Sequence, residues 1–292
     1  MRAGNEPVNR VKNRSQEALP YDHSRVVLIN SQNSDYINAS YIAGADSPCE
    51  YIATQAPLYS TLSDFWRMVY EHRTGVIVML CDSVENGKKM VDPYWPDEIN
   101  VPVRHGELTV TMTGVSVLDA YAMRQIKVTM KDRQDLRVTQ LCIRGWSERG
   151  CSIPAEKLID VIRVAGREAT KSSGPVTVHC NLGVGRTGMF IALDLLTRFV
   201  DNHALNLVVN VYDVVQRMMG CRPNIIQTLT QYMFIHDVLG VIIGKKMKNG
   251  SRGATSSVVY QNEGHTINEY NELHEHIRDE HVYSALNEHQ MK

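Results

Sequence analysis

The pattern of hydrophobic and polar positions predicts mostly strands in the first half of the chain. Residues 35–42 alternate apolar and polar side chains, as an exposed strand does, and residues 51–58 form a second short strand that a proline ends. Residues 76–80 are continuously apolar, which indicates a central strand buried on both faces. Repeated alternation over residues 107–144 predicts antiparallel hairpin strands.

Helical spacing dominates the second half. Besides an early helix over residues 62–72, apolar residues recur at helical intervals over 154–169, 211–219 and 226–243. Strands followed mainly by helices predict an α+β fold. We expect a single domain over residues 1–244, with a central, highly twisted mixed β-sheet flanked by helices.

The composition changes after this domain. Residues 245–292 hold few large aliphatic side chains and many Asn, Glu, His and Ser residues, which predicts a polar, mostly disordered tail with a weak helix over 267–280. Tyr260, Tyr270 and Tyr283 lie in this tail near acidic residues. Two roles are open to these tyrosines: they are solvated residues of the tail, or they are docking sites for phosphotyrosine-binding adaptors.

A glycine-rich loop separates a β-prone run at 175–178 from an apolar run with helical spacing at 189–200. A strand, a glycine-rich loop and a helix start in this order form a cradle for an anion. Consecutive backbone N–H groups point inward, and the helix N-terminus adds a positive potential. Gly183, Gly185 and Gly188 let the backbone curl tightly around a ligand.

Cys180 opens this loop and Arg186 closes it. The arginine supplies a planar, charged fork that binds two oxygens of a phosphate. The same positive surroundings favour the thiolate and should lower the pKa of Cys180. A thiolate that faces a bound phosphate predicts nucleophilic attack on phosphorus, giving a phosphocysteine that water hydrolyses. The alternative, a glycine-rich turn around a buried cysteine, explains few of the residue types at these offsets.

The overall composition argues against several other classes. A formal net charge of −1 over 292 residues gives no electrostatic basis for binding nucleic acid or a membrane surface. No apolar run reaches the length of a transmembrane helix, so we expect no membrane insertion. The six cysteines are scattered without paired spacing, which indicates reduced thiols and no zinc site. We therefore expect a cytoplasmic protein that needs no metal or cofactor.

The segment Val178–Gly188 resembles the signature loop of the protein tyrosine phosphatases, Cys-x5-Arg-Ser/Thr preceded by His. Other segments, within about residues 8–243, resemble landmarks of the classical, tyrosine-specific members of that family. These segments are 12–14, 35–40, 55–57, 64–68, 94–96 and 227–232. The resemblance implies hydrolysis of phosphotyrosine on partner proteins through a phosphocysteine intermediate.

The resemblance also implies roles for single residues around Cys180. Arg186 would hold the phosphoryl group, and Thr187 would donate its hydroxyl to the leaving thiolate or cap the following helix. His179 would tune the thiol or serve as a core histidine. Gln227 would place the hydrolytic water. The substrate-binding residues implied are Asn181, Leu182, Gly183, Val184, Gly185, Arg186, Arg14, Ser15, Glu17 and Gln231, and the supporting residues are Glu85, which would pair with Arg186, and Trp146.

Three departures from the family pattern fall on the chemistry. Glu148 stands in Trp146-Ser147-Glu148 where the family has an aspartate general acid after Trp-Pro, and its carboxyl group is one methylene further out. Ser15 replaces a tyrosine that walls the phosphotyrosine slot, and Met90 replaces a lysine. These changes resemble the second phosphatase domains of receptor-type enzymes.

The sequence therefore leaves two hypotheses. The first is a cytoplasmic protein tyrosine phosphatase of reduced activity, as the intracellular part of a receptor-type enzyme or on its own. The second is an inactive phosphatase-like domain that binds phosphotyrosine or regulates a partner phosphatase.

Overall fold

The computed structural model describes residues 1–29, 34–146, 153–203 and 209–250. Its core is a nine-stranded mixed sheet in the order β1-β2-β3-β11-β4-β10-β9-β8-β7. The strands are β1 (Arg25–Val27), β2 (Tyr36–Ile42), β3 (Tyr51–Thr54), β4 (Val76–Met79), β7 (Pro102–His105), β8 (Leu108–Val117), β9 (Tyr121–Met130), β10 (Leu136–Ile143) and β11 (Val176–His179). A separate short hairpin joins β5 (Val84–Glu85) to β6 (Lys88–Lys89).

The centre of the sheet is parallel and both flanks are antiparallel. Strands β3, β11, β4 and β10 run in the same direction, with His179 of β11 between Thr54 of β3 and Met79 of β4. Strands β2 and β9 pair antiparallel to the two outer members of this group. The carboxyl ends of the parallel strands therefore lie side by side, which is where open sheets of this kind place their ligands.

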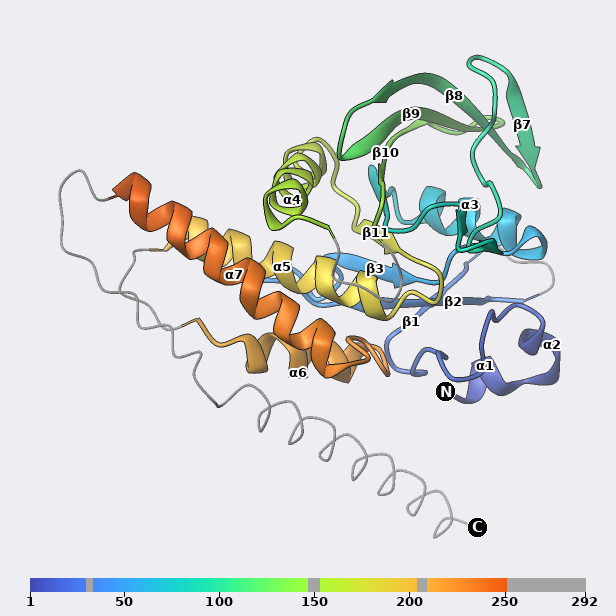
Figure 1. Cartoon of the computed structure of the whole chain (residues 1–292). Helices are drawn as coiled ribbons and strands as arrows, with labels where there is room; N and C mark the ends of the chain where they lie inside the picture. The colour runs from blue at the N-terminus through green and yellow to red at the C-terminus, as the bar shows by residue number, and fades with distance from the viewer. Residues whose placement is uncertain (30–33, 147–152, 204–208, 251–292) are drawn as a thin grey trace, which may run out of the picture.

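Helices cover both faces of the sheet (Figure 1). On one face lie α4 (Ala155–Ala169), α5 (Gly185–Asn202), α6 (Val211–Cys221) and α7 (Leu229–Gly250), and on the other α3 (Leu62–Glu71), preceded by a 3-10 turn (Tyr59–Thr61). Short helices α1 (Arg2–Asn5) and α2 (Pro7–Arg10) precede β1. Each face has its own buried apolar core, as expected for a sheet covered by helices on both sides.

Strand β4 shows why this segment of sequence is continuously apolar. Val76 and Val78 pack into the core beneath α4 and α5, whereas Ile77 and Met79 pack into the core beneath α3. Each of these side chains is at most 1% exposed. A strand covered on both faces needs apolar residues at every position, so the predicted central strand is confirmed.

The predicted α+β class, mixed sheet and flanking helices are confirmed, but the boundaries of two helices were wrong. Helix α5 begins at Gly185, inside the glycine-rich loop, and not at residue 189. Helix α7 begins at Leu229 and not at residue 226, where the backbone is left-handed, and it continues past the expected end at residue 243 to Gly250. The extension has a tertiary cause, because the Lys246 ammonium group donates to the main-chain oxygens of Val200, Asp201 and His203 at the end of α5. The predicted tail helix and tail tyrosines lie outside the described residues.

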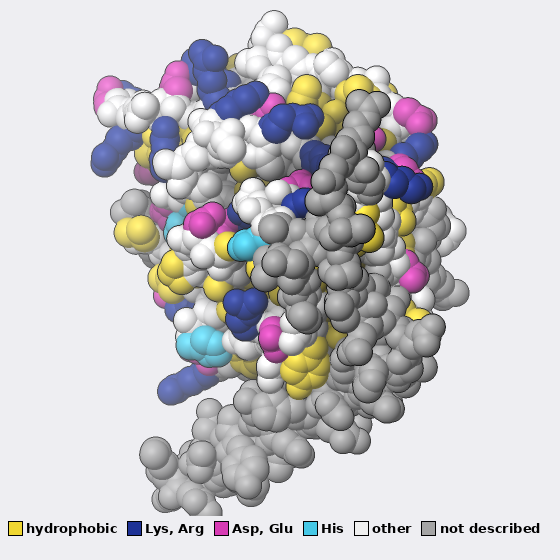
Figure 2. Space-filling view, turned by 90° about the vertical axis from the view of Figure 1, so that its left-hand side faces the viewer, with side chains coloured by type: hydrophobic (Ala, Val, Ile, Leu, Met, Phe, Trp, Pro, Cys, Tyr) yellow, Lys and Arg dark blue, Asp and Glu magenta, His cyan; other side chains and the backbone are white. Residues whose placement is uncertain are grey.

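The surface carries mixed charge. On the face shown in Figure 2, basic and acidic side chains are interspersed with neutral ones, in keeping with the formal net charge of −1. Among the described residues, no helix is both long enough and apolar enough to cross a membrane.

Candidate active site

The glycine-rich loop connects β11 to α5 at the carboxyl edge of the parallel strands (Figure 1). We call residues 180–186 the phosphate loop. Gly183 adopts φ +71°, and a Cβ atom there would lie 2.1 Å from the main-chain oxygen of Thr54, at the end of β3. Only glycine fits this conformation and this approach. Ala56 fixes the loop further, since its N–H donates to the Asn181 oxygen at 2.9 Å.

Cys180 lies at the bottom of the phosphate loop and is 5% exposed. Burial alone would raise the pKa of its thiol, but four other interactions outweigh burial and lower it. These are the charge of Arg186, hydrogen bonds from the hydroxyl and N–H of Thr187, and a hydrogen bond from the N–H of Gly183. The Thr187 hydroxyl lies 3.3 Å from the sulfur. The site therefore favours the nucleophilic thiolate.

Arg186 is held in place through one of its terminal nitrogens. Its Nη1 donates to Glu85 Oε1 at 2.6 Å and to the main-chain oxygen of Trp146. Glu85 reaches it from the β5–β6 hairpin, and both partners are nearly buried, at 3% and 8% exposure of their side chains. The expected pairing of these residues is present in the structure, and Trp146 contributes through its backbone.

His179 contacts the backbone of Cys180 and not its thiol. Gln140 Nε2 donates to the Tyr94 hydroxyl at 2.5 Å, which in turn lies 2.8 Å from His179 Nε2. This order of donors assigns the proton of His179 to Nδ1, which donates to the Cys180 oxygen at 3.1 Å. Burial lowers the pKa of His179 to about 4, so the imidazole is neutral near pH 7. His179 thus orients the first peptide of the phosphate loop.

Gln227 and Gln231 lie over the phosphate loop, although they follow it by more than a helix in sequence. A Cβ atom on Gly185 would lie 3.0 Å from Gln227 Oε1 and 2.7 Å from Gln231 Nε2. Gln231 also fixes its neighbour, because its Oε1 accepts a hydrogen bond from the Gln227 N–H at 2.7 Å. The structure brings both predicted glutamines to the site.

The segment that precedes β1 supplies another wall. Gln55 binds it at two points, accepting from the Arg14 N–H at 2.9 Å and donating to the Lys12 oxygen at 2.7 Å. The Arg14 guanidinium, expected to bind substrate, donates to the main-chain oxygens of Ala56 and Pro57 and so braces the wall from behind. Ser15 accepts a hydrogen bond from the Glu17 N–H at 3.1 Å.

One functional residue was missed from the sequence. Arg222, at the end of α6, is fully buried and donates to the main-chain oxygens of Gly183 at 2.8 Å and Leu182 at 3.2 Å. It also donates to Asn38 Oδ1 at 2.8 Å, and the Asn38 amide donates to Asn13 Oδ1 at 2.9 Å. This one side chain therefore connects the phosphate loop to residues 12–17 before β1, which we call the recognition segment. Nothing in the local pattern around residue 222 distinguishes it from a surface arginine.

Two departures from the family pattern fall in different places. Glu148 and Ser147, the expected acid and its neighbour, lie outside the described residues. Met90 is buried at 1% exposure, and its N–H donates to the Ser83 oxygen at 2.9 Å, which closes the hairpin that carries Glu85. The Met90 side chain thus packs into the apolar core on the α3 side of the sheet.

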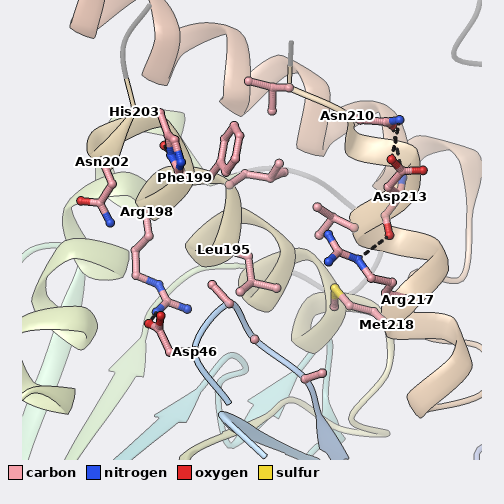
Figure 3. A pocket seen from close by; sticks show the side chains of 16 residues that line it. Asp46, Leu195, Arg198, Phe199, Asn202, His203, Asn210, Asp213, Arg217 and Met218 are labelled. Carbon is pink, nitrogen blue, oxygen red and sulfur yellow. Dashed lines mark hydrogen bonds and ion pairs between the residues drawn. The ribbon is translucent and has the colours of Figure 1, made fainter. Parts of the chain in front are cut away.

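A cavity of about 520 Å³ lies elsewhere, around the C-terminal half of α5 (Figure 3). Its walls include Leu195, Phe199 and Met218, with Arg198 and Arg217 at its edges. The N-terminus of α5 borders Cys180, and an 18-residue helix is about 27 Å long. The cavity is therefore separate from the phosphate loop.

The site combines a cysteine beside the N-terminus of α5, an arginine bound to Glu85, and two glutamines near Gly185. The sequence matches the family profile described as "Protein-tyrosine phosphatase" over residues 9–240. This chain belongs to the protein-tyrosine phosphatase family. The match covers the phosphate loop, the Glu85 hairpin and both glutamines.

Three similar proteins share 38% sequence identity with this chain, and two of them are named as receptor-type. Phosphatidylinositol phosphatase PTPRQ of Rattus norvegicus is 38% identical over 244 residues, covering 82% of this chain and 10% of the relative. Receptor-type tyrosine-protein phosphatase V of Rattus norvegicus is 38% identical over 239 residues, covering 80% and 14%. Receptor-type tyrosine-protein phosphatase H of Homo sapiens is 38% identical over 237 residues, covering 79% and 21%. The phosphatase chain thus spans a small part of each relative.

A solved structure of PTPN18 in complex with HER2 phosphopeptides has the same fold. It superimposes with a TM-score of 0.78 at 34% identity, covering 83% of this phosphatase chain and 91% of the other. The similarity extends over nearly the whole of the described domain.

Proposed function

We propose that this phosphatase chain hydrolyses phosphotyrosine on proteins, with Cys180 as the nucleophile. The observation that supports this most is the environment of the Cys180 sulfur. It receives hydrogen bonds from Thr187 and Gly183, faces Arg186, and has a pKa below its ordinary value. A stabilised thiolate within an anion cradle is the arrangement that attack on a phosphate ester requires.

In the first step, the Cys180 thiolate attacks phosphorus and forms an S–P bond while the P–O bond to the tyrosine breaks. The leaving phenolate oxygen takes a proton from the acid that we assign to Glu148. Arg186 binds two of the equatorial phosphoryl oxygens through the Nε and Nη2 donors, since Glu85 and the Trp146 oxygen occupy Nη1. Backbone N–H groups of residues 181–185 bind the remaining charge.

In the second step, water attacks phosphorus and the S–P bond breaks. The electron pair of that bond returns to sulfur. One water proton passes to the Glu148 carboxylate, which gave up its proton in the first step, and the other remains on the released hydrogen phosphate. The Thr187 hydroxyl, 3.3 Å from the sulfur, stabilises the departing thiolate. Gln227 and Gln231 orient the water from their position over Gly185.

Two comparisons bear on the substrate. The similar PTPN18 structure carries phosphopeptides, which supports phosphotyrosine proteins as partners. One relative is named a phosphatidylinositol phosphatase, so a soluble phosphoinositide is the informative competing substrate. The receptor-type relatives support an intracellular, cytoplasmic location as part of a longer protein. We place the domain boundary at the end of α7, near Gly250, because Lys246 of this helix is still bound to the end of α5. The tail tyrosines are the candidate docking sites for phosphotyrosine-binding adaptors.

The test compares the wild type with Cys180→Ser on a phosphotyrosine peptide and on a short-chain phosphoinositide. We expect peptide turnover that the substitution abolishes, with slower release of phosphate from the lipid. The absence of turnover at micromolar enzyme would contradict the proposal. Phosphotyrosine binding without turnover would instead support the second hypothesis, a binding or regulatory module.

That second hypothesis rests on Ser15, Ser147 and Glu148. The triple substitution Ser15→Tyr, Ser147→Pro and Glu148→Asp restores the family pattern and separates the two ideas. A large gain in rate would show that these positions attenuate an otherwise complete site. An unchanged rate would show that they do not.

A further inference from the structure

Ile226 has a backbone conformation that its side chain disfavours. Its φ is +62°, in the left-handed region. A β-branched residue is a genuine outlier there, because its Cβ substituents crowd the backbone. Strain of this kind persists only where the surrounding structure imposes it, and it concentrates at functional sites. Ile226 directly precedes Gln227, one of the two glutamines over the phosphate loop.

Two contacts hold Ile226 in this conformation. Its N–H donates to the main-chain oxygen of Val184 at 3.2 Å, and the same oxygen accepts from the Gly188 N–H at 3.0 Å. Its fully buried side chain occupies the space that a side chain at Gly188 would need, since a Cβ atom on Gly188 would lie 2.8 Å from Ile226 Cγ1. The residue is thus fixed both to the phosphate loop and to the first turn of α5.

The left-handed turn decides where the next residue points. Beyond Ile226, the Gln227 N–H meets Gln231 Oε1 at 2.7 Å, and Gln227 Oε1 lies beside Gly185. The Val184 carbonyl therefore accepts hydrogen bonds both from the first turn of α5 and from Ile226, the residue before Gln227. It fixes the position of Gln227 relative to the start of α5. The Gln227 side chain itself is exposed, so its direction depends on the backbone that carries it.

We propose that Ile226 is a positioning residue for the second chemical step: its buried side chain clamps a left-handed turn that aims Gln227 at the phosphocysteine. This inference rests on the proposed phosphatase function. In that step water forms a bond to phosphorus, the S–P bond breaks, and the thiolate leaves with the electron pair, as described above. Formation of the phosphocysteine does not need Gln227, so the clamp should matter for hydrolysis alone.

The test uses three substitutions. Ile226→Gly removes the clamp while permitting a positive φ, and Ile226→Val keeps a β-branched side chain with most of its volume. Ile225→Ala is the matched control, because Ile225 is also fully buried and its Cγ1 lies 2.7 Å from the same Gly188 position, yet its φ is not positive. Rapid-quench kinetics with a labelled phosphotyrosine peptide separate the phosphorylation burst from steady-state turnover.

We expect Ile226→Gly to keep a burst rate near the wild-type value while steady-state turnover falls by about ten- to a hundredfold. Phosphocysteine should then accumulate. Ile226→Val should restore turnover to within a few fold, and Ile225→Ala should leave the ratio of the two rates unchanged. Equal slowing of both steps in Ile226→Gly, or the same loss in Ile225→Ala, would overturn the inference.

Hydrogen exchange decides the positioning claim without turnover. The Gln227 N–H should be protected in the wild type and in Ile225→Ala, and should exchange faster in Ile226→Gly. Unchanged protection in Ile226→Gly would overturn the inference. A wild type that forms no phosphocysteine would instead overturn the proposed function, and the exchange data would still decide whether Ile226 positions Gln227.

Discussion

The guanidinium of Arg222 lies between two walls of the site, with Nε 2.8 Å from the Gly183 oxygen and Nη2 2.8 Å from Asn38 Oδ1. Asn38 in turn binds Asn13 of the recognition segment. Because Arg222 and Asn38 are both buried, the hydrogen bonds between these groups are shielded from water. The shape of the phosphate loop is therefore coupled to the position of the substrate wall.

Replacing Arg222 should damage both stability and activity. Arg222→Met leaves several buried oxygens without a donor, at about 1–3 kcal/mol for each unsatisfied group, so we expect the free energy of unfolding to fall by at least 3 kcal/mol. Urea denaturation measures this loss. Arg217→Met on the exposed side of the same helix is the control, and it should change stability by less than about 0.5 kcal/mol. Similar losses in the two variants would contradict the assigned role.

Thr187→Ala should raise the pKa of Cys180, because it removes the hydroxyl that lies 3.3 Å from the sulfur. A lowered pKa keeps the thiol ionised at pH values where an ordinary cysteine is protonated. The rate of iodoacetamide alkylation against pH should therefore shift to higher pH in Thr187→Ala. Thr187→Ser retains the hydroxyl and should follow the wild type; a profile identical in all three proteins would refute the contribution of Thr187.

Stability should fall as the pH decreases from about 6.5 to about 4. Burial lowers the pKa of His179 to about 4 from an ordinary value of 6.5. Between these values the unfolded chain binds a proton that the folded protein excludes, so acidification favours unfolding. The stability contributed by neutral His179 is complete above pH 6.5 and is lost progressively below it.

His179→Gln checks this assignment, since its amide does not titrate. The free energy of unfolding, measured by urea denaturation across this pH range, should depend less on pH in the variant than in the wild type. An equal slope would assign the pH dependence to other groups, such as buried His236, whose pKa burial also lowers to about 4.

Asn224 should tune substrate affinity. It adopts φ +58°, and its amide donates to the Glu17 oxygen at 2.7 Å. This hydrogen bond joins the turn before Gln227 to the recognition segment. Asn224→Gly keeps the backbone conformation but loses the bond, so KM should rise several fold with stability nearly unchanged.

Asn224→Ala loses the same hydrogen bond. It also introduces alanine, which adopts the left-handed conformation less readily than either asparagine or glycine. It should therefore destabilise the protein by about 1 kcal/mol more than Asn224→Gly, measured by thermal unfolding. Equal stability of the two variants would show that the backbone strain at this position is small.

The sequence predicts the residues whose type and local spacing indicate a chemical role. It does not predict residues that act only through partners distant in sequence. The order of strands and helices and the loop around Cys180 follow from local periodicity and residue type. Arg222 was missed because it binds main-chain oxygens far away in sequence, and such partners leave no local pattern. The extension of α7 has the same origin, because Lys246 is held by the end of another helix. The expectation that Gln227 and Gln231 lie at the site came from the family resemblance, because their spacing in the sequence alone does not predict it.

Four residues that form or brace the site follow the carboxyl ends of four neighbouring parallel strands. Gln55 follows β3, Cys180 follows β11, Glu85 follows β4 and Trp146 follows β10. The long ribbon of β7, β8 and the far end of β9 contributes none of these four groups. Variation at the exposed positions of this ribbon should therefore leave the reaction centre intact, whereas Leu108 and Val110 of β8 pack into the core beneath α3 and support the fold.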